Sequence, residues 1–163
     1  MYFMIRPNEI TYFVFDDIDK WLSKNGYEEI EIAEDKIYFL IKAKKSFYGY
    51  FFDVNIKYND TTRIVHIIAQ SSTSVSKEKR MFCLKLLNHI SFYDEEEKYI
   101  LDPFDHSISC STVFSILDSG CSIGKSIEFS ASMSILNLVN IHEAMKYEDV
   151  RICDLNPIRF YND

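Results

Sequence analysis

The sequence predicts an α+β domain in which helices pack on one antiparallel sheet, in the order helix, three strands, helix, two strands, helix. Near the two ends, residues 8–25 and 125–147 place apolar side chains at the spacing of an amphipathic helix. Between them, residues 27–70 alternate β-branched and aromatic residues with polar ones, which is typical of consecutive antiparallel strands. Strands that are grouped apart from the helices along the chain favour α+β over a parallel sheet.

The helix expected over residues 8–25 has one apolar face and clear signals at both ends. Glu9 lies in its first turn and Lys24 in its last, as the helix dipole favours. Asn25 and Gly26 follow, and such residues commonly end a helix because they adopt the left-handed conformation. The apolar face of this helix consists of Ile10, Phe13, Val14, Ile18, Trp21 and Leu22.

Four segments of the next stretch have the composition of strands. Asn59 and Asp60 predict a tight hairpin between the last two, because both residues tolerate positive φ and bond to their own backbone. The first segment is very short, so the sequence leaves open whether three or four strands precede the second helix. We expect the strands at residues 30–32, 37–43, 48–58 and 62–70, with turns at residues 33–36, 44–46 and 59–60.

The second half of the chain predicts a helix, a hairpin and a last helix. Ser76 is a candidate N-cap for the second helix. A proline-containing turn separates two strands that begin near Tyr99 and Ile108. We interpret residues 1–147 as one domain and residues 148–163 as a C-terminal tail that packs on it. The apolar face of the second helix consists of Phe82, Cys83, Leu86, Leu87 and Ile90.

The composition is that of a folded, acidic chain. Of 163 residues, 47% are hydrophobic and 15% are aromatic, which is too apolar for disorder. The 18 basic and 25 acidic residues give a net charge of −7, which argues against nucleic acid and membrane partners, since both reward positive surfaces. No apolar run is long enough to cross a membrane, so we expect a cytoplasmic protein. The cysteines form no CxxC pair and are interpreted as reduced structural thiols; they are Cys83, Cys110, Cys121 and Cys153.

Several stretches together resemble the YbjN domain family, which shares a fold with the small chaperones of type III secretion. The similar stretches are residues 64–68, 76–80, 86–90, 98–108 and 120–126, with the last helix, and they span residues 60–145. The resemblance implies a secretion-chaperone-like fold. It also implies a non-enzymatic binding role, because no enzymatic activity is agreed for the family. The Phe-rich first hairpin and the C-terminal tail depart from the usual form of the family.

Three motifs would support a different function if they were complete. Residues 120–126 are similar to a phosphate-binding loop, but only three residues separate the glycines where that loop needs four. Cys121, at the expected helix start, is a candidate nucleophile, yet nothing in the sequence brings any of the four histidines to it. Asp102, Asp105 and His106 have a spacing that suits a metal site and equally a turn. We therefore predict no catalytic residue, no cofactor and no metal.

The remaining signals concern surfaces. The acidic run at residues 94–97 is interpreted as a solvated loop, with recruitment of a basic partner as the alternative. Aromatic residues fall on both faces of the strand expected over residues 48–58, so either the chain's own helices and tail cover them or a partner does. The candidate partner-binding residues are Phe47, Tyr48, Tyr50 and Phe52.

Two functional hypotheses from different classes remain. The first is a chaperone- or adaptor-like module that binds another protein and regulates it, with a homodimer left open. The second is a small-ligand or anion sensor, or an enzyme of a new kind, that uses a cleft near Cys121 and Lys125 between the sheet and the last helix.

Overall fold

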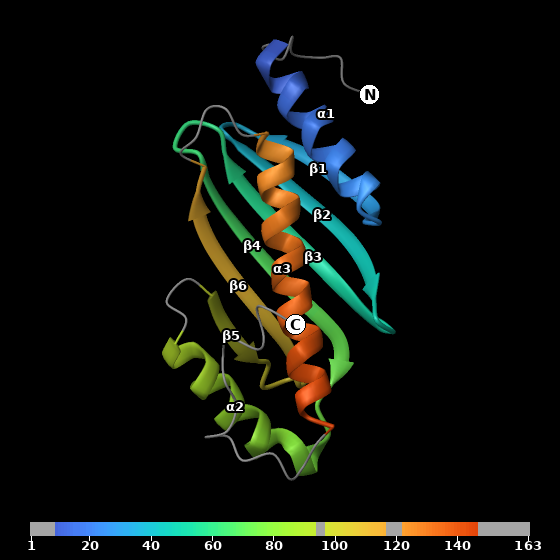
Figure 1. Ribbon diagram of the computed structural model, residues 1–163. Helices are drawn as coiled ribbons and strands as arrows, with labels where there is room; N and C mark the ends of the chain where they lie inside the picture. The colour runs from blue at the N-terminus through green and yellow to red at the C-terminus, as the bar shows by residue number, and fades with distance from the viewer. Residues whose placement is uncertain (1–8, 94–96, 117–121, 147–163) are drawn as a thin grey trace.

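The computed structural model of the chain describes residues 9–93, 97–116 and 122–146, and in these residues the predicted α+β fold is confirmed (Figure 1). The elements along the chain are α1 (Glu9–Lys24), β1 (Glu28–Asp35), β2 (Tyr38–Phe47), β3 (Tyr50–Asn59), β4 (Ile64–Ser74), a 3-10 turn (Lys77–Lys79), α2 (Arg80–Tyr93), β5 (Glu97–Leu101), β6 (Ser107–Ser115) and α3 (Ile123–Ala144). They build one antiparallel sheet of strand order β1-β2-β3-β4-β6-β5.

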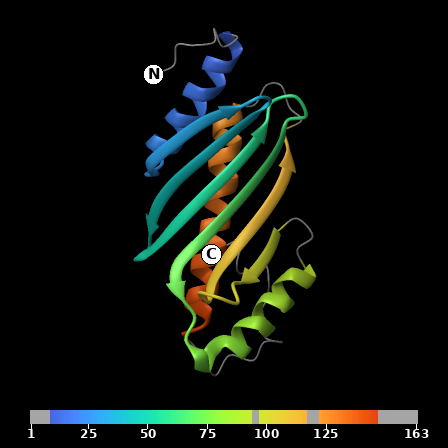
Figure 2. The same cartoon turned by 180° about the vertical axis from the view of Figure 1, so that it is seen from behind.

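The described helices leave one face of the sheet uncovered. On the other face, which we call the covered face, α3 lies along the sheet and contacts β3, β4 and β6, and α1 lies beside α3 and contacts β1 (Figure 1). Helix α2 packs against β5 at one end of the sheet. Seen from behind, strands β2, β3 and β4 have no described helix in front of them (Figure 2). We call this second side the open face.

Alternation along each strand sends successive side chains to opposite faces, as the pleat of a strand requires. On β4, Val65, Ile67 and Ala69 are buried beneath α3. Ile64 and Ile68 point to the other face of the sheet and are exposed. Burying such a side chain stabilises the fold by roughly 1.5–3 kcal/mol, so the covered face supplies most of the stability. The open face carries Leu40, Lys42, Lys44, Asp53, Asn55, Lys57, Ile64, His66, Ile68, Gln70, Ser111 and Val113.

The first hairpin does not turn where the sequence suggested. The turn predicted at residues 44–46 is wrong, because β2 continues to Phe47 and the chain reverses at Tyr48 and Gly49. Both turn residues have positive φ, 49° at Tyr48 and 80° at Gly49, which is the pattern of a two-residue hairpin turn whose twist matches the strands. Gly49 adopts this conformation without strain, whereas the polar residues 44–46 alternate between the two faces like the rest of the strand.

The turn predicted at residues 33–36 is also displaced, because β1 runs to Asp35 and the turn falls at residues 36–37. Strand β1 thus extends well beyond the three residues expected, and four strands precede α2. The hairpin predicted at Asn59 is present, and the Asn59 side-chain oxygen accepts hydrogen bonds from the backbone N–H of Thr61 at 2.9 Å and of Thr62 at 3.0 Å. No helix in the described ranges is long and apolar enough to span a membrane. The tail expected over residues 148–163 lies outside the described residues.

Candidate partner-binding surfaces

The structure separates the four aromatic residues that the sequence proposed for partner binding. Phe52 is 1% exposed and lies in the core of the covered face, so its side chain is not available at the surface of this chain. Phe47 and Tyr50 pair across the first hairpin and are half-buried. Tyr48, in the turn itself, is 77% exposed, and its ring contacts Phe47 edge-on with 4.6 Å between centroids. Phe51, on the open-face side, is also exposed.

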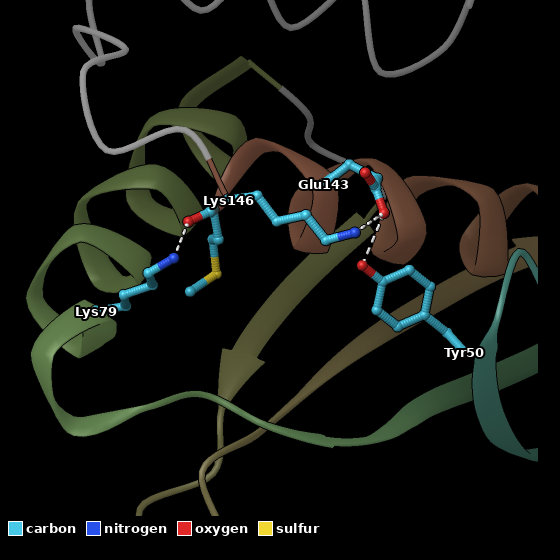
Figure 3. Close-up of polar contacts among 5 residues, drawn as sticks. Tyr50, Lys79, Glu143 and Lys146 are labelled. Atoms are coloured by element: carbon cyan, nitrogen blue, oxygen red, sulfur yellow. Dashed lines mark hydrogen bonds and ion pairs between the residues drawn. The ribbon is translucent and has the colours of Figure 1, made fainter.

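Tyr50 fastens this hairpin to the C-terminal end of α3 (Figure 3). Its hydroxyl donates to Glu143 Oε1 at 2.8 Å, and Lys146 Nζ donates to the same oxygen at 2.7 Å. The Tyr50 ring stacks on the buried His142 ring, with 5.0 Å between centroids. Burial, followed by the bond to Glu143, raises the pKa of Tyr50, while the Lys146 contact, followed by the Tyr50 bond, lowers the pKa of Glu143. These groups bond to one another and leave no catalytic pair facing a cleft.

Two lysine side chains, Lys79 and Lys45, connect neighbouring elements by hydrogen bonds to backbone oxygens. Lys79 Nζ donates to the backbone oxygen of Met145 at 2.9 Å, which joins the start of α2 to the last turn of α3 (Figure 3). Lys45 Nζ donates to the backbone oxygen of Asn25 at 2.8 Å and lies 4.5 Å from the centroid of the Tyr27 ring. Burial lowers the pKa of Lys45. These contacts anchor the part of the hairpin around Lys45 to residues 25 and 27. The turn residue Tyr48 remains exposed.

The start of α3 is occupied by the chain's own carboxylate. Asp17 Oδ2 of α1 accepts hydrogen bonds from the Ser122 hydroxyl at 2.7 Å and from the Gly124 backbone N–H at 2.8 Å. Ser122 in turn caps the helix by accepting from the backbone N–H of Lys125 at 3.1 Å. A helix N-terminus attracts anions, and here Asp17 is that anion. The hypothesised anion site near Lys125 therefore lacks the Gly124 donor, and Cys121 lies outside the described residues.

Two of the candidate metal ligands, Asp102 and Asp105, stabilise the turn between β5 and β6. Asp102 Oδ1 accepts from the backbone N–H of Phe104 at 2.7 Å and of Asp105 at 3.2 Å, which is a turn stabilised by its first side chain. Hydrogen bonds from the Ser107 hydroxyl and N–H lower the pKa of Asp105. Within the described ranges, no cluster of three potential metal ligands occurs.

The described histidines and cysteines do not form a reactive group. His66 lies on β4 at the open face, His89 on α2, His106 in the β5–β6 turn and His142 on α3, so the four histidines come from separate elements. Cys83 and Cys110 are free and buried, as predicted for structural thiols. Burial raises the pKa of Cys83 to about 11 and of Cys110 to about 12, so both are protonated and unreactive at neutral pH.

One interior polar cluster escaped the sequence analysis. Glu97, expected in a solvated loop, begins β5 and is 8% exposed. Its carboxylate accepts from the Tyr99 hydroxyl, from Asn137 Nδ2 at 2.8 Å and from Cys110 Sγ at 3.7 Å. The prediction of a solvated position was wrong for this residue, because Glu97 shares the inward face of the strand with Tyr99. Its position two residues before Tyr99 was the signal in the sequence.

No described helix covers the open face (Figure 2). Its exposed apolar side chains include Leu40, Ile64, Ile68 and Val113, with Ile100 at the β5 edge. A shallow hollow of about 260 Å³ lies over β2, β3 and β4. We call it the open-face hollow, and it is lined by Leu40, Ile41, Lys42, Asn55, Ile56, Lys57, His66 and Ile68.

Comparison with known proteins gives a similarity to solved structures. No protein-family model matches the chain, and no curated protein matches it. Among solved structures, it matches a crystal structure described as "YbjN, a putative transcription regulator from E. coli". The chain is similar to YbjN. The match covers 86% of this chain and 93% of the YbjN chain, with a TM-score of 0.46 and 16% sequence identity. The sequence resemblance and the structural match therefore point to the same fold, that of YbjN.

Proposed function

We propose that this protein is a non-enzymatic protein-binding module that acts as a chaperone, adaptor or regulator of another protein. The observation that supports the proposal is the open face, where aliphatic side chains are exposed on a rigid sheet and no described helix covers them. Contiguous exposed apolar side chains rimmed by polar ones are typical of interaction sites. The functional groups elsewhere are engaged in caps, turns and interior hydrogen bonds.

The first hairpin extends this surface at one end. Of the four aromatic residues predicted to bind a partner, Tyr48 remains the best placed, and Phe51 joins it because it is 64% exposed. Tyrosine and phenylalanine contribute large contact areas at interfaces for little loss of side-chain entropy. We expect the hairpin tip to contribute to the same interface as the open face.

Paired variants test this function. Ile68→Asp with Val113→Asp places carboxylates on the open face, whereas Phe129→Ser removes an exposed aromatic from the outer side of α3 and serves as the control. Native partners recovered from cell extract with the wild-type chain should be lost with the open-face variant and retained with the control. Equal thermal unfolding of the three proteins is required for the comparison.

Light scattering on the purified chain completes the test. A homodimer formed through the open face would become a monomer in the Ile68→Asp, Val113→Asp variant and would persist in Phe129→Ser. Partner recovery that is unaffected by the open-face variant would contradict the proposed function, and so would recovery lost equally in both variants.

A further inference from the structure

The charged side chains around the open-face hollow have one sign. Its charged lining residues are Lys42 and Lys57, and no carboxylate is among its lining residues. The hollow is therefore locally positive, whereas the chain as a whole has a net charge of −7. The neighbouring hollow toward β1 shares Lys42 with it but mixes both signs, since Glu29, Glu31, Lys44 and Asp53 also line that hollow. There Lys44 Nζ lies 3.0 Å from Glu29 Oε2.

The two lysines of the open-face hollow have no carboxylate partner in the part of the chain that the structure describes. Lys42 lies opposite Glu31 in the sheet register, yet the two side chains form no ion pair. Lys57 Nζ lies 4.1 Å from the centroid of the Tyr38 ring, a cation–π contact that positions the ammonium without neutralising it. Among the described residues, these two lysines therefore lie beside exposed apolar side chains without an ion pair to a carboxylate.

The register of the sheet places apolar and cationic side chains next to one another in two adjacent rows across β2, β3 and β4. Leu40 lies opposite Lys57, and Lys57 lies opposite His66. In the adjacent row, Lys42 lies opposite Asn55, which lies opposite Ile68. Side chains directly opposite one another on antiparallel strands are about 4.5–5.5 Å apart at Cβ. Leu40 is thus next to both lysines, and a ligand that contacts it also reaches their ammonium groups.

We propose that the open-face hollow binds an acidic segment of a partner protein, with one apolar side chain seated on Leu40 and Ile68 and flanking carboxylates paired with Lys42 and Lys57. The inference rests on the proposed function and names the chemistry of the partner. The hollow, at about 260 Å³ and open to solvent, is smaller than the roughly 300–1,000 Å³ of small-molecule pockets and suits a side chain of a longer chain. Complementary charges at such a site favour encounter with the correct partner.

Nucleic acid fits this surface less well. Its hollow has an aliphatic floor, and the nearby ring of Tyr38 is already covered by Lys57. Single-stranded nucleic acids bind proteins largely by stacking their bases on exposed aromatic rings, and no Phe, Tyr or Trp ring is among the residues that line the hollow. A second copy of this chain carries the same net negative charge, which disfavours long-range approach of the two copies.

Selection from a displayed library of random peptides tests the proposal without assuming a sequence. The library is selected on the wild-type chain and counter-selected on Lys42→Gln with Lys57→Gln. We expect peptides in which an apolar residue lies between Asp or Glu residues. A synthetic peptide of the selected sequence should bind the lysine variant about tenfold more weakly, and its affinity for the wild type should fall with added salt.

Matched controls separate this inference from the proposed function. Lys77→Gln with Lys85→Gln removes two exposed lysines near and on α2 and should leave peptide affinity unchanged. Basic or uncharged selected peptides, no enrichment at all, or equal affinity for both lysine variants would overturn the acidic-segment proposal. A labelled DNA duplex whose binding depends on Lys42 and Lys57 would overturn it as well. If native partners are lost with Ile68→Asp, Val113→Asp and kept with the lysine variant, the protein-binding function stands and the charge assignment falls.

Discussion

The two faces of the sheet use the same residue types for different purposes. Ile67 and Ile68 are neighbours on β4, yet Ile67 is 0% exposed beneath α3 and Ile68 is 37% exposed on the open face. Buried side chains on the covered face of β2, β3 and β4 are aliphatic or aromatic except for Ser71, whereas lysine, asparagine and histidine interrupt the apolar residues on the open face. The comparison teaches that one face holds the fold together and that the described helices leave the other exposed.

The largest expected effect comes from truncating the two isoleucines separately. Ile67→Ala should lower the free energy of unfolding by about 2–4 kcal/mol, because it leaves a cavity in close-packed surroundings. Ile68→Ala should cost less than about 1 kcal/mol, since solvent already reaches that side chain. Urea denaturation of both variants measures the difference. Similar losses would show that a further part of the chain covers the open face, and the comparison would break.

An intermediate effect is expected where α1 and α3 meet above the covered face. A Cβ at Gly124 would lie 2.3 Å from the backbone oxygen of Asp17, so Gly124→Ala forces the two helices apart. We expect a loss of about 1–3 kcal/mol in unfolding free energy, typical of overpacking. Ser126→Ala on the same helix is the control and should be nearly neutral. An unchanged stability of Gly124→Ala would mean that the helices adjust freely and that their contact does not define the covered face.

The smallest effect is a pH dependence at the C-terminal end of α3. Burial lowers the pKa of His142 below its ordinary value of 6.5, so the unfolded chain binds this proton more tightly than the folded chain does. The stability due to neutral His142 is present above about pH 6.5 and is lost as pH falls through the folded pKa. Tyr50, Glu143 and Lys146 surround the ring, and Glu143 alone favours its protonated form.

Replacing the histidine by a ring that does not titrate sharpens this test. His142→Phe keeps an aromatic partner for Tyr50 and should reduce the loss of stability between about pH 7 and pH 5.5. His66→Asn, on the open face, is the control and should keep the wild-type pH dependence. Denaturation curves at several pH values give the slopes. If the unfolding free energy of His142→Phe depends on pH as steeply as that of the wild type, His142 is not the source of the pH dependence.

Local patterns predicted the elements well. Helix α1 has an apolar face whose described members Val14, Ile18 and Leu22 are buried, and Asn25 with Gly26 ends it as expected. Alternation identified β3 and β4, because the pleat imposes a period of two on any half-buried strand. The turn of the first hairpin was misplaced, since charged residues on the open face look the same in sequence as residues of a turn.

The candidate site was predicted only in part. The Phe-rich hairpin was recognised as unusual, but alternation placed Phe52 in the core while the turn exposed Tyr48. Glu97 was expected in solvent and lies inside, because its partner Asn137 comes from a helix that the sequence places far along the chain. The carboxylate of Asp17 at the start of α3 depends equally on a contact between distant segments.

The sequence by itself determined the class of fold, the positions of the helices and strands, and the acidic charge of this protein. These follow from periodicity, turn residues and composition, which are local properties of the chain. Only the tertiary structure decided which sheet face the helices cover and which carboxylate caps α3. It also decided that Lys42 and Lys57 lie beside Leu40 with no ion pair to a carboxylate of the described residues. Such choices depend on the packing of segments far apart in sequence, where many pairings are compatible with the same local pattern.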